Sequence, residues 1–315
     1  MHFEDDGAAR LLLRDADAGT VLAEYVYAPA EPPLESPRPY ALLRSTAGAE
    51  ATAYRPDDHV WHKGLSVALP VVGSENFWGG PTYVHGEGYV QLANNGSQVH
   101  RAFLSPQRGP ESRGEDGRDA HVTEVLDWIA EDGRRVLSEE RRLRARRLDA
   151  ATWALSWHSA LRNETDGPLG FGSPTSKGRE NAGYAGIFWR GPSPWTGGEI
   201  VGPGGVVGDA ARGAAGPWLA FVDPSRTTGV LVVDTGLTVT AHGNPWFARS
   251  EEYAGLNPAP FFYEETTLAP GETLVLAAVI VVGEHEGLPR RERRLLVEEG
   301  RRIEPGVFLA AREPR

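Results

Sequence analysis

Two histidines stand three residues apart in a polar segment that directly precedes an apolar run. Residues 57–64 read DDHVWHKG, and the apolar run spans residues 65–72. Neutral imidazoles bind metal ions, and an imidazole also transfers protons near neutral pH. Residues three apart face opposite sides of a regular strand, so a shared metal requires a turn or a helix here. His59 and His62 are therefore candidates for a metal pair or an acid/base, or for hydrogen bonds that hold the loop.

A third histidine, His85, lies beside glycines at the start of a predicted strand, in the run YVHGEG. Glycine lets a ligand or another segment of chain approach closely. His85 could join His59 and His62, which would place three imidazoles around one divalent cation. The alternative is an exposed histidine at the end of a strand.

A second dense cluster begins near residue 243 and combines tryptophan, arginine and carboxylates. Arg249 could clamp a carboxylate or orient a hydroxyl group, and Glu252 or Glu264 could act as a general base. Trp246 and Asn257 belong to the same cluster and could contact a substrate.

A long stretch rich in glycine, proline and aromatic residues spans 167–216 and contains the run KGREN. Glu180 and Asn181 offer a carboxylate and an amide, although a solvated charge cluster is the alternative. Trp189 presents a flat apolar face that could stack on a sugar ring or cover the core. No Walker loop, Gly-x-Gly-x-x-Gly turn or Gly-x-Ser-x-Gly elbow frames these residues, so nucleotide binding and serine hydrolysis are poor interpretations.

The elements that must position these residues are strands, because the dominant hydrophobic period is two. Residues 122–129, 135–147 and 152–162 predict a long antiparallel meander, in which 141–147 is a strand with a charged face rather than a helix. Further strands are expected in these ranges: 11–15, 20–27, 40–44, 51–54, 65–72, 83–92 paired with 99–104, 218–222, 229–234, 261–268 and 273–282. Residues 289–299 predict a short C-terminal helix. We expect an all-β fold, a large antiparallel β-sandwich in one domain over residues 1–315.

The amino-acid composition excludes several classes of partner and of chemistry. The 315 residues carry 32 Lys and Arg against 43 Asp and Glu, a net charge of -11, which disfavours nucleic-acid and anionic-lipid partners. The absence of cysteine excludes disulfides, thiolate nucleophiles and cysteine-bound metals. The acidic N-terminus does not resemble a signal peptide, and no apolar window is long enough to span a membrane. We therefore expect a cytoplasmic protein without a membrane partner.

Several boxes together resemble a bacterial family of unknown function, DUF6807. They are the runs RPY at 38–40, DHVWHKGL at 58–65, NFWG at 76–79, FGSP at 171–174, NAGY at 181–184, FWRG at 188–191, NPWFARS at 244–250 and NPAPFF at 257–262. Members often carry a methane oxygenase (PmoA) label, whereas this chain has no apolar span of the kind that a membrane oxygenase needs. The resemblance implies a β-sandwich, similar to the supersandwich of galactose-mutarotase-like proteins, and a carbohydrate-related substrate.

The resulting hypothesis is an enzyme that acts on a sugar or glycoside-like metabolite by mutarotase-, epimerase- or glycosidase-type proton transfer. The catalytic candidates are His59, His62, His85 and Arg249. The substrate-binding candidates are Trp78, Glu180, Asn181, Trp189, Trp246 and Asn257. A non-catalytic carbohydrate-binding module and a metal-dependent, cupin-type oxygenase are the alternatives. The cofactor is open, and a divalent metal ion bound by the histidines is the candidate. The sequence leaves the substrate, the reaction and the oligomeric state open.

Overall fold

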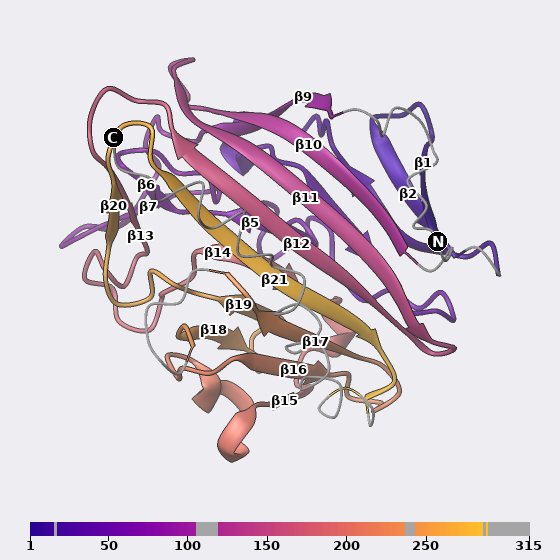
Figure 1. The fold of residues 1–315 in the computed structure, drawn as a ribbon. Coiled ribbons are helices and arrows are strands. Elements are labelled where there is room, and N and C mark those ends of the chain that lie inside the picture. The colour runs from indigo at the N-terminus through magenta and orange to yellow at the C-terminus, as the bar shows by residue number, and fades with distance from the viewer. Residues whose placement is uncertain (16–17, 105–118, 237–242, 286–287, 289–315) are drawn as a thin grey trace, which may run out of the picture.

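Two large antiparallel sheets form the protein, as a computed structural model shows (Figure 1). The structure describes residues 1–15, 18–104, 119–236, 243–285 and 288. Each of the two sheets has eight strands. The described helices are short 3-10 turns, at Pro33–Glu35, Ser193–Trp195, Pro203–Gly205 and Gly208–Ala211. The all-β prediction is confirmed.

The first sheet has the strand order β1-β2-β3-β4-β5-β14-β19-β18. Its strands are β1 (His2–Asp5), β2 (Arg10–Arg14), β3 (Val21–Val26), β4 (Tyr40–Leu43), β5 (Leu65–Ala68), β14 (Gly186–Arg190), β19 (Gly255–Pro258) and β18 (Trp246–Arg249). The N-terminal strands pair in chain order, whereas β14 and the β18–β19 hairpin join β5 from far along the chain. The segments near residues 60 and 250 are thereby brought to one end of this sheet.

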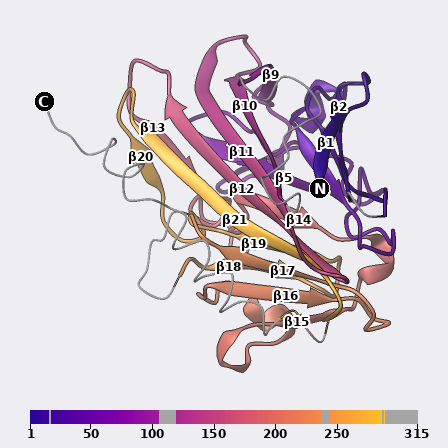
Figure 2. The ribbon, with the colours of Figure 1, turned by 45° about the vertical axis from the view of Figure 1, so that its right-hand side comes forward.

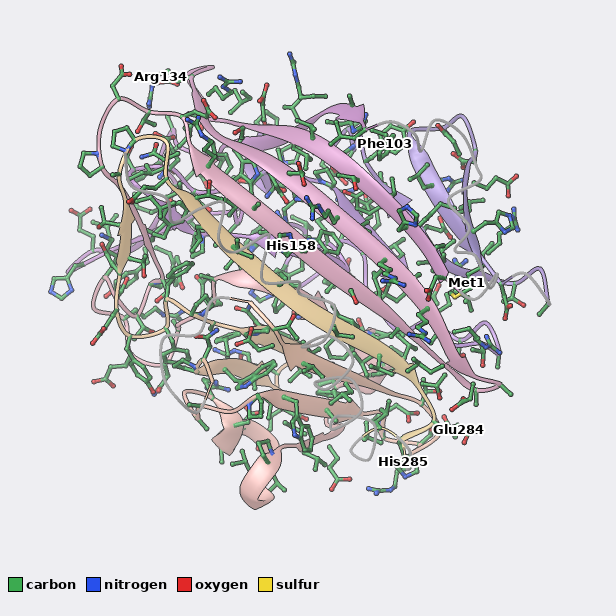
Figure 3. All side chains as sticks on the ribbon, viewed as in Figure 1. Met1, Phe103, Arg134, His158, Glu284 and His285 are labelled. Atoms are coloured by element: carbon green, nitrogen blue, oxygen red, sulfur yellow. The ribbon has the colours of Figure 1, made fainter. Side chains whose placement is uncertain are left out.

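The second sheet has the order β15-β16-β17-β21-β12-β11-β10-β9. Its strands are β15 (Glu199–Val201), β16 (Trp218–Val222), β17 (Gly229–Asp234), β21 (Thr273–Gly283), β12 (Thr152–Asn163), β11 (Arg135–Asp149), β10 (Asp119–Ile129) and β9 (Ser97–Phe103). The long strands run diagonally across it (Figure 2), and His158 lies midway along β12 (Figure 3). Smaller sheets join β20 (Thr266–Leu268), β13 (Leu169–Gly172) and β6 (Val71–Val72), and pair β7 (Thr82–Val84) with β8 (Gly88–Val90).

The main hydrophobic core contains buried side chains from both sheets. Alternation along β12 turns Trp153, Leu155, Trp157 and Leu161 toward it, as the period-two pattern predicts. The indole of Trp153 donates a hydrogen bond across the sandwich to the carbonyl of Arg44, at 2.8 Å. Burial of these large aromatic side chains is the dominant stabilising contribution of the interior.

A polar network is also buried between the sheets. The guanidinium of Arg141 donates to both carboxylate oxygens of Glu139, at 2.7 and 2.8 Å, and to the hydroxyl of Tyr25 at 3.1 Å. Tyr25 in turn donates to Glu124. All four side chains are almost completely buried, and within the described part of the chain each of their polar atoms has a partner. We call Tyr25, Glu124, Glu139 and Arg141 the interior network.

The predicted meander is confirmed, and residues 141–147 lie within strand β11 rather than in a helix. Three predicted strands were wrong. Residues 51–54 form no strand, and Tyr54 makes only an isolated bridge to Lys63. Residues 83–92 form their own hairpin, β7–β8, because the turn at 85–87 reverses the chain, and β9 pairs with β10 instead. Of residues 261–268, only Thr266–Leu268 is a strand. The predicted helix 289–299 lies outside the described residues, and within them no helix is long and apolar enough to cross a bilayer.

Candidate functional site

A cavity of about 290 Å³ lies on the face of the first sheet that points away from the main core. The turn before β5, the β6–β7 connection, β8, the β13–β14 connection and the β18–β19 hairpin all contribute to it. Its lining residues are His59, Trp61, His62, Trp78, Gly79, Pro81, Tyr89, Arg179, Tyr184, Phe247, Arg249, Glu252 and Tyr253. The two predicted boxes, near residues 60 and 250, therefore meet in one cavity.

Strand alternation decides which side chains reach this face. In β18, Phe247 and Arg249 line the cavity, whereas Trp246 and Ala248 belong to the main core. In β14, Phe188 packs on the cavity side, while its neighbour Trp189 packs into the main core. Consecutive residues of a strand point to opposite faces of the sheet. Of two neighbouring residues, one therefore lines the cavity and the other packs in the core.

A tight turn brings the two histidines together. The backbone N–H of His62 donates to the carbonyl of His59 at 2.9 Å. The two imidazoles are stacked, with ring centres 4.5 Å apart and ring planes 6° from parallel. Tyr253 contacts both rings edge-on, at 5.5 and 5.6 Å between ring centres. The turn thus creates the juxtaposition that a regular strand would have prevented.

Arg38 fixes the two walls on either side of these histidines. Its guanidinium is fully buried and donates to the carbonyl of Trp61 at 2.7 Å and to that of Trp78 at 2.9 Å. The close approach of these walls requires glycine at residue 79, where φ is 102° and a Cβ would lie 2.7 Å from Cβ of Trp61. Lys63, also buried, bonds to Glu35 and to the carbonyl of Val60. The RPY, HKG and FWG runs therefore hold the shape of the cavity.

His62 is a buried, neutral imidazole. Burial lowers the pKa of His62 well below its ordinary value of 6.5, and the nearby His59, Arg190 and Arg38 lower it further. Its Nδ1 atom is buried and has no hydrogen-bond partner in the described part of the protein. An unpaired buried polar atom costs free energy, so its presence here calls for a functional explanation.

Asp58 connects His59 to a buried arginine. Its carboxylate lies 3.0 Å from Nδ1 of His59 and accepts two bonds from Nη2 of Arg190, at 3.0 and 2.9 Å. Burial raises the pKa of Asp58, but the bonds from His59 and Arg190 outweigh it and leave that pKa below its ordinary value. An ionised Asp58 selects the tautomer of His59 that carries its proton on Nδ1, which leaves Nε2 free to accept a proton.

Arg190 is itself only partly satisfied. Its guanidinium lies over the ring of Tyr253, 4.0 Å from the ring centre, and is 2% exposed. Nε and Nη1 have no partner within the described residues. Burial lowers the pKa of Arg190, although Asp58 opposes this effect.

The rim carries two further guanidiniums. Arg249 pairs with Glu252, and the side chain of Arg249 is 13% exposed whereas that of Glu252 is 65% exposed. Arg179 bonds to the hydroxyl of Tyr89 and lies over its ring. The same hydroxyl lies 2.8 Å from that of Tyr184, whose pKa burial raises well above its ordinary value. Burial likewise raises the pKa of Tyr253 to about 12, so both phenols stay protonated.

The stacked histidines do not fit a shared metal ion. An imidazole binds a metal along a lone pair that lies in its ring plane, and the planes of His59 and His62 are almost parallel and separated. One ion cannot lie in both planes. In the part of the chain that the structure describes, no group of three or more His, Asp or Glu side chains is placed to hold a metal.

The predicted residues divide into two groups. His59, His62, Trp78 and Arg249 line the cavity, as does Glu252, one of the two candidate bases. Six others do not line it, and neither does Glu264, which is exposed. These six are His85, Glu180, Asn181, Trp189, Trp246 and Asn257.

Each of the six has a physical reason for its position. His85 is exposed in the β7–β8 turn and packs beside Gly178, while Glu180 and Asn181 are exposed. The indoles of Trp189 and Trp246 are buried and donate to backbone carbonyls, so neither offers a free face.

Asn257 is fully buried, and its side chain forms hydrogen bonds with backbone groups. Its side chain accepts from the N–H of Ala185 and donates to the carbonyls of Ile187 and Pro258, each at 2.9 Å. It therefore joins β14 to β19 and contacts no cavity.

Sequence reasoning missed most of the aromatic walls and the rim. Trp61, Tyr89, Tyr184, Phe247 and Tyr253 were not selected as site residues, although all line the cavity. The signal that was available is strand parity: once Arg249 is chosen, Phe247 shares its face and Trp246 does not. Arg179 lies in the KGREN run, from which Glu180 and Asn181 were chosen instead, and nothing local in the sequence marks Tyr89. Both residues reach the cavity through tertiary packing.

A model of the family described as a family of unknown function, DUF6807, matches residues 16–294. No curated protein matches the sequence. Among solved structures, a heparan sulfate lyase from Pedobacter heparinus is similar at 9% identity over 90% of this chain and 36% of that one, with a TM-score of 0.41. An α-galactosidase from Geobacillus stearothermophilus is similar at 11% identity over 87% of this chain and 40% of that one, with a TM-score of 0.42.

A protein from Synechocystis is similar at 13% identity over 90% of this chain and 95% of its own, with a TM-score of 0.38. This chain thus spans well under half the length of the lyase and of the galactosidase. At such low scores the likenesses carry no argument about fold or activity.

Proposed function

Because the chain belongs to the DUF6807 family, whose function is unknown, we propose a function from its own cavity: an enzyme that acts on a sugar or glycoside-like metabolite by proton transfer. The observation that carries this proposal is the stacked pair of imidazoles in the cavity wall. One of them is buried and neutral, and its Nδ1 has no partner among the residues that the structure describes. The other is oriented by a carboxylate.

The pair can supply a proton acceptor and a hydrogen-bond donor. The Asp58 carboxylate holds the Nδ1 proton of His59, so Nε2 of His59 accepts a proton from a substrate hydroxyl. His62 remains neutral, and a neutral imidazole has one N–H that can donate a hydrogen bond. In mutarotation, Nε2 of His59 takes the proton of the anomeric hydroxyl while the N–H of His62 donates a hydrogen bond to the ring oxygen, and the protonated His59 then gives its proton to that oxygen. The ring opens with no net change in protons, and closure reverses both transfers.

The remaining walls suit a sugar. Trp61, Trp78 and Tyr253 provide flat faces beside the histidines, and the hydroxyls of Tyr89 and Tyr184 provide polar groups. Ligand sites of this kind combine apolar walls with a few polar groups that fix the orientation of the ligand. Arg249 orients the substrate from the opposite side.

The experiment is a screen of reducing sugars and their oxidised derivatives by polarimetry, with wild type, His59→Gln and His62→Gln compared. His121→Gln is the matched control, because His121 is exposed on β10 and does not line the cavity. We expect each cavity variant to lose about 10²-fold or more in kcat/KM and the control to lose none.

Equal activity in all four proteins would overturn the proposal. Circular dichroism and thermal unfolding of each variant separate loss of activity from loss of folding. If the wild type binds sugars but never turns them over, the non-catalytic carbohydrate-binding function replaces the enzymatic one.

A further inference from the structure

The charge of the cavity is opposite to that of the whole chain. The chain has a net charge of -11, yet two guanidiniums, of Arg179 and Arg249, line the cavity against one carboxylate, that of Glu252. A concave site lined by charge of one sign attracts ligands of the other sign. The site is thus cationic in an otherwise acidic protein.

Within the described residues, neither guanidinium forms an ion pair with a buried carboxylate. Among the described residues, the ion-pair partner of Arg249 is Glu252, whose side chain is 65% exposed, while the side chain of Arg249 is 13% exposed. A solvent-exposed ion pair contributes only about 0–1 kcal/mol, so an incoming carboxylate can replace Glu252. Arg179 bonds to the hydroxyl of Tyr89, a neutral group, and no carboxylate among the residues that the structure describes forms an ion pair with it.

A third cation lies directly behind the cavity wall. Arg190 stacks on Tyr253, a lining residue, and its Nε and Nη1 have no partner within the described residues. Arg190 is buried, so its positive charge is weakly screened by solvent. The carboxylate of Asp58 accepts two bonds from Nη2 of Arg190 and offsets much of this charge, so the excess positive charge of the cavity rests on Arg179 and Arg249.

We infer that the ligand of this cavity is an acidic sugar, a uronate or aldonate whose carboxylate binds between Arg249 and Arg179. Arginine binds a carboxylate through two parallel N–H bonds, which fixes orientation as well as position. The inference rests on the proposed function for the sugar part of the ligand and adds the carboxylate. It assigns Arg249 and Arg179 as the residues that determine specificity.

The test compares affinities for matched pairs of ligands by isothermal titration calorimetry. The pairs are glucuronate with glucose, galacturonate with galactose, and gluconate with glucitol. We expect at least one acid to bind about tenfold or more tightly than its neutral counterpart, and the preference to weaken with added salt.

Arg249→Gln and Arg179→Gln should each reduce that acid preference by about tenfold. The matched control is Arg226→Gln, because Arg226 is exposed, pairs with Glu199 and does not line the cavity, so it should leave the preference unchanged.

Two results would overturn the inference: no acid in the panel binds more tightly than its neutral partner, or the rim variants weaken both members of a pair equally. Its failure is distinguishable from that of the proposed function. Acid preference without turnover removes only the enzymatic function, whereas turnover of neutral sugars without acid preference removes only the inference.

Discussion

The cavity and the interior network both surround buried charges with aromatic rings, but they differ in how completely their polar atoms are paired. In the interior network, Arg141 lies over Trp157 and has hydrogen-bonding partners on all sides. At the cavity, Arg190 lies over Tyr253, and within the described part of the chain two of its nitrogen atoms and Nδ1 of His62 have no hydrogen-bond partner. Buried polar groups that stabilise a fold typically have all their hydrogen bonds made within the protein. Buried polar groups with unused hydrogen-bonding atoms are typical of binding sites.

The largest effect is expected from Arg141→Met. The substitution leaves the buried carboxylates of Glu139 and Glu124 without their guanidinium, so the free energy of unfolding should fall by about 3–5 kcal/mol. Urea unfolding followed by tryptophan fluorescence measures this loss. Arg226→Met is the exposed control, and a loss of about 1 kcal/mol or less for Arg141→Met would remove the contrast between the two regions.

A smaller effect concerns the pH dependence of stability. The pKa of His62 in the folded protein lies well below 6.5, its ordinary value. Above pH 6.5 His62 is neutral in both the folded and the unfolded chain and contributes nothing to the pH dependence. As the pH falls below that value, His62 becomes protonated in the unfolded chain but stays neutral in the folded protein. The free energy of unfolding therefore falls by at most about 1.4 kcal/mol per pH unit.

His62→Gln should therefore make the unfolding temperature less sensitive to pH between about pH 5 and pH 7 than it is in the wild type. Burial also lowers the pKa of His158, but that residue is present in both proteins and cancels in the comparison. Identical pH profiles would show that His62 takes up a proton as readily in the folded protein as in the unfolded one.

Arg190→Met is the direct counterpart of Arg141→Met. Over the described ranges of the chain, two nitrogen atoms of Arg190 have no partner to lose, and the side chain of Asp58 is 42% exposed and can be solvated by water. We expect stability to change by about 1 kcal/mol or less, because methionine fills the same space without a desolvated charge. A loss as large as that of Arg141→Met in urea unfolding would mean that Arg190 holds the structure.

The smallest effect should come from Glu252→Gln at the rim. Its ion pair with Arg249 is exposed, so stability should change by less than about 1 kcal/mol. The variant frees Arg249, and glucuronate affinity should rise by about threefold in calorimetry. Unchanged or weaker glucuronate binding would contradict displacement of Glu252 by a ligand carboxylate.

The strands were predictable because alternation is a local property. The meander over β10, β11 and β12 follows from period two, and the same rule turned Trp157 inward. The hairpin of residues 83–92 was not found, because Asn94-Asn95-Gly96 resembled a turn. In the structure the side chains of Asn94 and Asn95 bond instead to the carbonyls of Ser74 and Gly80.

The site was half predictable for a related reason. The histidine and arginine boxes are local clusters, and they do meet. The choice of Trp246 and Trp189 as sugar platforms failed on parity, since each lies one residue away from a side chain on the cavity face. Arg179 and Tyr89 come together only through the folded chain, and no spacing in the sequence encodes that contact.

The bonds from Arg38 to the carbonyls of Trp61 and Trp78 have a consequence for affinity. One side chain is hydrogen-bonded to two separate loops and holds them together before any ligand binds. The conformational freedom of both loops is already lost when the protein folds, so it need not be lost again on association. The contacts of a small molecule with the cavity then contribute to its binding free energy without a deduction for ordering these loops. The preformed shape of the cavity discriminates between ligands without a preceding rearrangement.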